Sequence, residues 1–190
     1  MEPLLIDVPA KLRTKRLLLR CPRPEDGQIV LPSVRQSLAE LKAWMPWAHD
    51  EYGLADAESW CRKCAAEFTL RSNLQYLILW PETREHLGNI GAFRFDWKVP
   101  RGEIGYWLRT DQTGKGLMSE AVDGLTHLLL DTLKFNRIEI HTDDRNQRSS
   151  RVAERCGYVL EGTLHNDLRL KDGSLRNTRI YTRTANERAA

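Results

Sequence analysis

The sequence predicts an α+β fold in which a mixed, mainly antiparallel central sheet is flanked by helices. Three observations lead to this prediction. The middle of the chain is rich in β-forming residues divided by short polar turns, a long amphipathic segment follows a glycine-containing loop, and a strand, a short helix and two more strands complete the pattern. We expect a single domain over residues 1–190, with its core at about 10–183, because this length is typical of one domain.

The N-terminal part of the chain predicts one short strand followed by helical segments. Arg16–Arg20 is apolar at its centre and bounded by charges and prolines, which favours a strand. A helical stretch begins at Glu25, is interrupted near Pro32 and ends at Trp44, because Pro46 disfavours the helical conformation at Met45. Asp56–Arg71 carries apolar residues four positions apart, which predicts a helix.

Three strands are predicted in the middle of the chain, at Leu74–Trp80, His86–Phe95 and Glu103–Arg109. The segments between them are short and polar. Since short turns join antiparallel strands, whereas parallel strands need a long crossover, these three strands predict an antiparallel meander.

The C-terminal half begins with the polar loop Thr110–Gly116, which leads into a helix that extends to about Leu133. The apolar residues of that helix form a single stripe, as expected for a helix packed on a sheet. The remaining predicted elements are a strand at Arg137–Thr142, a short helix at Gln147–Cys156, and strands at Tyr158–Leu164 and Arg176–Thr182 joined through a turn at Lys171–Ser174.

Composition excludes several functional classes. The 29 Lys and Arg residues against 26 Asp and Glu give a net charge of +3, too small to predict binding to nucleic acid or to a membrane. No apolar run is long enough to span a bilayer, and Met1–Lys11 lacks a signal-peptide pattern. Cys61 and Cys64 lie inside a helical pattern with no second pair or nearby histidines, so we expect core thiols, no metal and a cytoplasmic location.

The loop before the long helix is the most informative stretch. Gly114 and Gly116 flank Lys115, directly before the helix N-terminus, where free backbone N–H groups and the helix dipole favour an anion. This arrangement predicts a pyrophosphate cradle or, alternatively, a tight turn that uses glycine for its backbone angles. A nucleotide-triphosphate P-loop is disfavoured by Arg109 and Gly116 at two of its fixed positions, and a dinucleotide-binding loop for NAD is a minor alternative.

Several short motifs follow one another in a fixed order along the chain. They are Arg16–Arg20, Trp44–Trp47, Gly105–Leu108, Gly114–Ala121, Asn146–Ser150 and Arg155–Gly162. With the order of the elements, they resemble the Gcn5-related N-acetyltransferase (GNAT) superfamily, and within it the RimJ/RimL-like branch of ribosomal-protein acetyltransferases. The resemblance covers about residues 10–183 and implies the GNAT sheet.

The resemblance implies acetyl-CoA as the cosubstrate and no metal. The superfamily signature [RQ]-x-x-G-x-[GA] falls on Asp111–Gly116, where Asp111 replaces the usual first residue and Gln112 follows it. Most contacts of such a cradle come from the backbone. The residues expected to bind acetyl-CoA are Trp107, Leu108, Arg109, Gln112, Thr113, Gly114, Lys115, Gly116, Leu117 and Asn146, with backbone N–H groups around 107–109 also expected to stabilise the oxyanion.

Two side chains are expected to move protons during the reaction implied by the resemblance. Only a neutral amine can attack a thioester, and a carboxylate can take its proton directly or through one water. Glu103, at the start of its strand, is our candidate base; the alternative is an ordinary surface glutamate. The tyrosine used as acid by many members is replaced by Ala153, so the resemblance makes Ser149 the candidate acid, although a serine there also suits helix capping.

Acceptor specificity is expected in the early helices and at their junction with the meander. Trp44, Trp47 and Trp97 are candidate walls of the acceptor site, or else core or dimer residues. The RimL-like resemblance implies the N-terminal amine of a protein, whereas other members act on small amines such as polyamines, amino sugars or antibiotics. A homodimer is expected by analogy. A noncatalytic acyl-CoA-binding module and an NAD-dependent oxidoreductase are the alternatives from other classes.

Overall fold

The computed structural model describes residues 2–170 and 172–185. Their strands form one eight-stranded sheet with the order β1-β2-β3-β4-β5-β6-β8-β7. The strands are β1 Lys11–Arg13, β2 Leu18–Arg20, β3 Leu74–Leu79, β4 His86–Asp96, β5 Arg101–Leu108, β6 Arg137–Asp143, β7 Val159–Arg169 and β8 Leu175–Thr184. Neighbouring strands are antiparallel except β5 and β6, which are parallel. The predicted mixed, mainly antiparallel sheet is confirmed.

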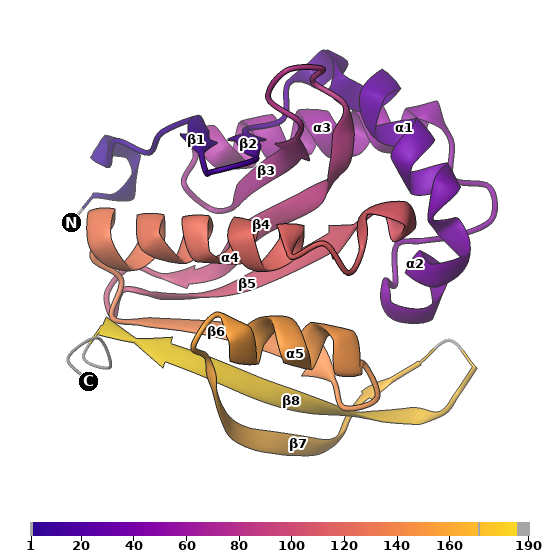
Figure 1. Ribbon diagram of the computed structural model, residues 1–190. Coiled ribbons are helices and arrows are strands. Elements are labelled where there is room, and N and C mark those ends of the chain that lie inside the picture. The colour runs from indigo at the N-terminus through magenta and orange to yellow at the C-terminus, as the bar shows by residue number, and fades with distance from the viewer. Residues whose placement is uncertain (1, 171, 186–190) are drawn as a thin grey trace.

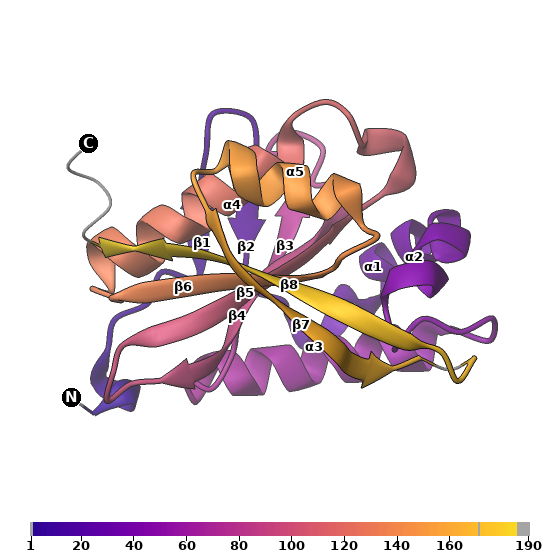
Figure 2. The same cartoon turned by 90° about the horizontal axis from the view of Figure 1, so that it is seen from below.

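Helices cover both faces of the sheet (Figure 1). They are α1 Gly27–Gln36, α2 Leu38–Trp44, α3 Leu54–Thr69, α4 Leu117–His127, continued by the π-helical turn η4 Leu128–Thr132, and α5 Gln147–Arg155, with 3-10 turns η1 Pro3–Leu5, η2 Pro24–Asp26 and η3 Thr110–Gln112. Figure 2 shows α4 and α5 on one side of the strands and α3 on the other. The sheet therefore separates two helical layers, and a ligand that contacts both must pass through the sheet.

Alternation along β5 distributes its side chains between these two layers. Ile104 packs in the core with α4, whereas Trp107 packs in a second core with residues of α1 to α3. The buried side chains of α4, such as Leu125, confirm the apolar stripe expected from the sequence. Each face of the sheet thus has its own apolar core, which fixes the register of β5 between them.

Two details of the predicted elements differ from the structure. The expected interruption near Pro32 is wrong, because α1 runs through Pro32 and the break falls at Ser37. Pro32 lies on the exposed side of α1, as does Gln28, whose carbonyl would otherwise accept from position 32, so that carbonyl can bind water. The short strand β1 was not expected; it pairs with β2 at the sheet edge. Of the predicted turn 171–174, Lys171 lies outside the described residues.

Within the described part of the chain, no helix combines the length and apolar character needed to cross a bilayer.

Candidate active site

The parallel strands β5 and β6 separate after a short paired region. Their registered residues are Arg101 with Arg137, Gly102 with Ile138, and Glu103 with Glu139. Beyond these pairs β5 continues to Leu108 and β6 to Asp143, but the two strands are no longer paired with each other. The sheet therefore opens between two of its central strands.

A cavity of about 790 Å³ occupies this opening and reaches both faces of the sheet. On the α4–α5 face its walls include the glycine loop, the first turn of α4 and part of α5. On the other face they include α2, and residues of the strands β4, β5, β6 and β8 also line the cavity. The residues that line it include Trp44, Trp47, Asn89, Tyr106, Trp107, Leu108, Thr113, Gly114, Gly116, Leu117, Ser119, His141, Asn146 and Ser149. A single cavity thus connects the glycine loop, the candidate phosphate-binding site, with the aromatic residues at the early helices.

The glycine loop presents free backbone donors to the cavity. Gly114 has φ +77° and Gly116 has φ +73°, angles that L side chains rarely adopt, so glycine is required at both positions. Gly116 caps α4 without a side-chain hydrogen bond, which leaves the first N–H groups of the helix available. Ser119 in the first turn lines the cavity, and its buried Oγ has no hydrogen-bond partner in the structure. These features favour an anionic ligand at this helix start.

Contacts from the N-terminal segment hold this loop in place. Glu120 in the first turn of α4 accepts hydrogen bonds from the Thr14 hydroxyl and from the backbone and side chain of Arg16, each at 2.6 Å. The Arg16 guanidinium also donates to the Lys115 carbonyl at 3.0 Å. Glu120 is the acidic residue in the first turn of α4, where it interacts favourably with the helix dipole, and it also fixes the loop through Arg16.

The polar side chains on the outer side of the loop form hydrogen bonds with one another and do not line the cavity. Arg109 donates two hydrogen bonds to Asp111 at 2.7 and 2.8 Å, and it also forms an ion pair with Glu85 at 2.6 Å. The side-chain amide of Gln112 donates to Asp111, and its carbonyl accepts from Lys115. Asp111, which departs from the superfamily signature, therefore braces the loop, and the side chains of Arg109, Gln112 and Lys115 lie outside the cavity wall.

The backbone of β5 offers donors on its open edge. Arg109 N–H is already bonded to the Leu87 carbonyl on β4 at 2.7 Å. Because N–H groups alternate between the two edges of a strand, the Leu108 N–H points away from β4, toward the opening. Of the backbone amides expected around 107–109, that of Leu108 is thus the one placed to bind a ligand, whereas the amide of Arg109 is occupied.

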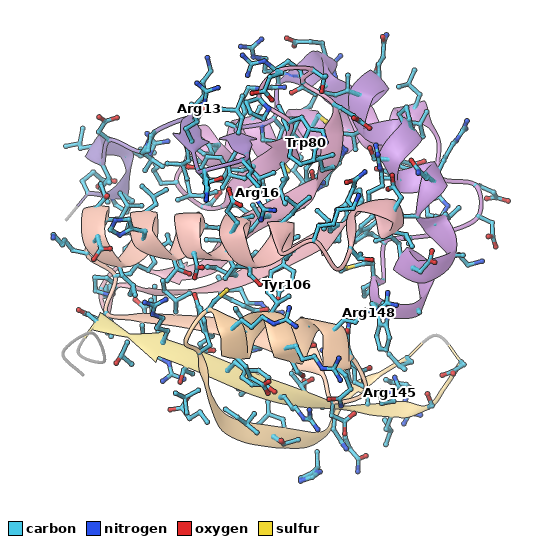
Figure 3. The ribbon with its side chains drawn as sticks, viewed as in Figure 1. Arg13, Arg16, Trp80, Tyr106, Arg145 and Arg148 are labelled. Carbon is cyan, nitrogen blue, oxygen red and sulfur yellow. The ribbon has the colours of Figure 1, made fainter. Side chains whose placement is uncertain are left out.

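Ser149 lies in the α5 wall of the cavity beside a tyrosine that the sequence analysis missed. Tyr106 lies 3.1 Å, Oη to Oγ, from Ser149 and donates toward its carbonyl at 3.2 Å. Figure 3 shows Tyr106 between α4 and α5. Asn146 caps α5 by accepting the Ser149 N–H at 3.1 Å. Burial raises the pKa of Tyr106 well above its usual range, which keeps its hydroxyl protonated.

Glu103 lies directly behind the cavity wall. Its carboxylate accepts a hydrogen bond from Arg94 at 2.8 Å, and its Oε2 is 3.5 Å from Nδ1 of His141, which does line the cavity. Burial raises the pKa of Glu103, and the charges of His141 and Arg94 oppose this shift. Glu103 therefore reaches the cavity through His141, a residue that the sequence analysis did not single out.

The three candidate tryptophans divide between the cavity and the core. Trp44 and Trp47 line the cavity, and the Trp47 ring lies 6.2 Å, centroid to centroid, from Trp107. Trp97 is outside the cavity; its ring packs against Phe95 and Phe135, and its indole N–H donates to a backbone carbonyl. Trp97 therefore packs in the core, the alternative that the sequence analysis gave to an acceptor wall, because its position just after β4 directs it to this aromatic cluster.

A buried histidine supports the cavity wall from behind. His86 is 2% exposed and packs on Trp107 at 5.7 Å between ring centroids. The Asn89 amide donates to His86 Nε2 at 2.8 Å, and its oxygen accepts from the Trp107 indole at 3.2 Å. Burial lowers the pKa of His86 to about 4, so the ring is neutral at pH 7 and can accept this hydrogen bond.

Comparison with known proteins identifies the family. A family model described as an acetyltransferase (GNAT) domain matches residues 16–159, more than half of the chain. The chain belongs to the GNAT acetyltransferase family. As a GNAT acetyltransferase it uses acetyl-CoA as acyl donor, which decides between the acyl-CoA and dinucleotide ligands that the glycine loop had left open.

Two of the proteins that this chain is similar to have names that refer to ribosomal proteins or to the ribosome. YdaF, a candidate ribosomal N-acetyltransferase of Bacillus subtilis (strain 168), is 25% identical over 159 residues, which is 81% of this chain and 84% of YdaF. The structure of RimL, a ribosomal L7/L12 α-N-protein acetyltransferase in complex with coenzyme A, has a TM-score of 0.85 at 21% identity and covers 92% and 97% of the two chains.

A second solved structure has a different kind of name. The microcin C7 self-immunity acetyltransferase MccE, solved with acetyl-CoA and AMP, has a TM-score of 0.86 at 21% identity, covering 93% of this chain and 97% of that chain. At this identity both structures show that the GNAT fold is shared.

The residues of the cavity fit acetyl-CoA. The free amides at the start of α4 and the unpaired Ser119 hydroxyl suit the diphosphate, and the open edge of β5 suits the amide groups of the pantetheine arm. Among the described residues, no group of three or more His, Cys, Asp or Glu side chains is arranged to hold a metal ion.

The glycine loop gives a first prediction. Replacing Gly114 by alanine forces a side chain onto φ +77°, which costs about 1–2 kcal/mol in the left-handed region. We expect acetyl-CoA to bind about 5–30-fold more weakly, as measured by isothermal titration calorimetry, because the strained loop moves its amides. Gly173→Ala, at φ +84° and outside the cavity, is the matched control for backbone strain; equal affinities of the two variants would contradict the assignment.

The neutral His86 gives a prediction for stability against pH. The folded protein binds a proton at His86 only near pH 4, whereas the unfolded chain binds it near pH 6.5, so stability is lost as the pH falls between these values. The loss attributable to His86 is about 3 kcal/mol at most. We expect His86→Gln to flatten the dependence of the free energy of unfolding on pH between 6.5 and 4 in urea titrations; an unchanged slope would show that His86 does not carry it.

Proposed function

We propose that this GNAT acetyltransferase is a single-domain enzyme that moves the acetyl group of acetyl-CoA to a primary amine, in first place the N-terminal α-amine of a protein such as a ribosomal protein. The observation that carries the proposal is the cavity that crosses the sheet between β5 and β6. Its α4–α5 side has donors for the acyl carrier, and its other side is lined by aromatic residues that can receive an acceptor. Homodimer formation and cytoplasmic location stay predictions.

The proposed reaction is direct attack of the amine on the acetyl carbonyl. Acetyl-CoA supplies an electrophilic thioester, and the amine must be neutral to attack it. A free α-amine titrates near 7.7–8.0 and a lysine side chain near 10.4, so an α-amine needs less help at pH 7. Glu103 is the proposed general base, and since it lies behind the wall it acts through an intervening group.

Ser149 is the proposed general acid. It lines the α4–α5 side of the cavity, on the same side as the glycine loop, where the sulfur of the acyl carrier would lie. The Tyr106 hydroxyl, 3.1 Å from Ser149 Oγ, remains protonated because burial raises its pKa, and it can return a proton to the serine. Asn146 caps α5 by accepting the Ser149 N–H, so the Ser149 hydroxyl is not used as a helix cap.

The preference for a protein N-terminus is supported by the rim of the cavity. Trp44 and Trp47 are 37% and 40% exposed, so these aromatic faces are open to a chain that extends away from the site. RimL and YdaF, whose names refer to ribosomal substrates, support the same acceptor class. A small-molecule amine is the second candidate, favoured by the likeness to MccE and by the ring cluster of Trp47, Tyr52 and Trp107.

An acceptor screen tests the proposed function. We expect thiol release from acetyl-CoA with peptides that have a free N-terminus, and none with the same peptides after N-acetylation, because the α-amine is the attacking group. Polyamines, amino sugars and lysine-containing peptides blocked at the N-terminus are compared in the same assay. A kcat/KM higher for a small amine than for every peptide would favour the second candidate.

The proposed acid and base give a matched prediction. Glu103→Gln and Ser149→Ala each remove one proton-transfer group, so we expect kcat to fall about 10²-fold or more in each variant, with affinity for acetyl-CoA retained. The measurement is steady-state thiol release together with calorimetric titration of acetyl-CoA.

Two conservative changes outside the cavity serve as controls for these variants. Glu82→Gln changes a charge in the exposed turn before β4, and Ser150→Ala removes the hydroxyl next to Ser149. Both are expected to keep the turnover of the unchanged protein. If Glu103→Gln or Ser149→Ala kept it as well, that residue would have no role in proton transfer.

A further inference from the structure

His141 lies on β6 at the point where the sheet opens. The last residue of β6 in register with β5 is Glu139, and His141 is the next residue on the same face of the strand. This face is opposite to α4 and α5, since the alternate residues Ile138 and Ile140 pack in the core with α4. The His141 side chain is 20% exposed and lines the cavity. It is therefore accessible from the side on which Trp44 and Trp47 lie.

Hydrogen bonding fixes the tautomer of this histidine. His141 Nε2 lies 2.7 Å from Glu139 Oε2, and Arg137 donates to the other oxygen of Glu139 at 2.7 Å. Although burial alone would raise the pKa of Glu139, the hydrogen bonds from Arg137 and His141 lower it. An ionised carboxylate only accepts hydrogen bonds, so the proton of the neutral ring resides on Nε2 and the lone pair on Nδ1.

The remaining ring nitrogen is the one close to the candidate base. Nδ1 of His141 is 3.5 Å from Glu103 Oε2, longer than a normal hydrogen bond, while Glu103 itself is bonded to Arg94. A positive charge on the ring would thus lie between two carboxylates, Glu103 and Glu139, each paired with an arginine. This is the carboxylate–histidine arrangement by which proteins orient and stabilise a proton-accepting imidazole.

Other charged groups of the same cavity come from β6 itself, from β8 and from α2. Asp143, two residues further along β6, is paired with Arg145, and Arg176 of β8 lines the same cavity. On the side of the helices, Glu40 of α2 also lines it. Of all these groups, the two carboxylates Glu103 and Glu139 are the ones within 3.5 Å of the ring.

We propose that Nδ1 of His141 is the atom that takes the proton from the attacking amine, with Glu103 and Glu139 as positioning residues on either side of the ring. The inference rests on the proposed function and refines it: His141 is the base that contacts the amine, and Glu103 contributes by positioning the ring. The amine nitrogen forms a bond to the acetyl carbon and gives one proton to Nδ1. The carbon–sulfur bond breaks and the sulfur receives a proton from the Ser149 side. The imidazolium later releases its proton to water, and the Ser149–Tyr106 pair takes one back from water.

The two faces of the sheet support this division of roles. His141 is reached from the face of the early helices, and Ser149 with Tyr106 lies on the face of α4 and α5. Direct attack adds the amine to one face of the carbonyl and gives a tetrahedral intermediate, in which the entering nitrogen and the departing sulfur are separate substituents of the same carbon and need separate proton-transfer groups. A base on one side of the opening and an acid on the other supply these two groups without any movement of the strands.

The test compares His141→Gln and His141→Ala with the unchanged protein, using the acceptor with the highest turnover. We expect kcat to fall about 10²–10³-fold in both variants, with KM for acetyl-CoA within about threefold. At low pH, log kcat/KM of the unchanged protein should rise with a slope near two, since both the amine and His141 must lose a proton. In the variants the slope should be near one, and added imidazole should restore turnover in His141→Ala.

Three measurements keep the test decisive. The thermal midpoint, with and without acetyl-CoA, shows that each variant folds and binds, and His141→Gln retains a donor toward Glu139 if the alanine variant does not fold. His165→Ala, on β7 outside the cavity, is the matched histidine control and should match the unchanged protein. Unchanged turnover in folded His141 variants, or lost turnover with an unchanged slope and no rescue by imidazole, would overturn the assignment of His141 alone. If the unchanged protein released no thiol with any amine, the proposed function would fall, and the assignment with it.

Discussion

The separation of β5 from β6 is the constraint on which the site depends. Two parallel strands that pair over three residues and then diverge leave backbone N–H and C=O groups without a ladder partner in the middle of a sheet. Such groups need hydrogen-bond partners, and the amide-rich arm of acetyl-CoA can supply them. The opening is tolerated because each strand is held on its other side, β5 by β4 and β6 by β8, over most of its length.

The remaining features of the site follow from this opening. Because the cavity crosses the sheet, the acyl carrier and the acceptor can be held by different layers of the protein. The donor side is rigid: Arg16 and Glu120 fix the loop to the N-terminal segment, and Asp111 fixes Arg109 at the strand end. The proposed acceptor side is formed by exposed aromatic rings at the end of α2 and just after it, so substitutions there would leave the acyl-donor side undisturbed.

Local signals in the sequence determined most of the fold and the donor half of the site. Alternating and helical periodicities depend on neighbouring residues along the chain, so the meander, the long helix and the final strands were predicted, although β7 extends to Arg169 instead of the predicted Leu164. The glycine loop was predicted for the same reason, since Gly114 and Gly116 are required by local backbone angles and the helix start provides free amides. The error at Pro32 arose because a proline on the exposed side of a helix costs less than the sequence rule assumes.

Tertiary structure alone decided which polar side chains meet. Glu103 and His141 are far apart in the chain and belong to different strands, and their proximity follows from the parallel register of β5 with β6. In the same way, Tyr106 meets Ser149 only because α5 packs over the opening, whereas Trp97 is withdrawn into an aromatic core at the end of β4. The sequence determined which residues have useful chemistry, but contacts between distant segments depend on strand order and register, which no local pattern encodes.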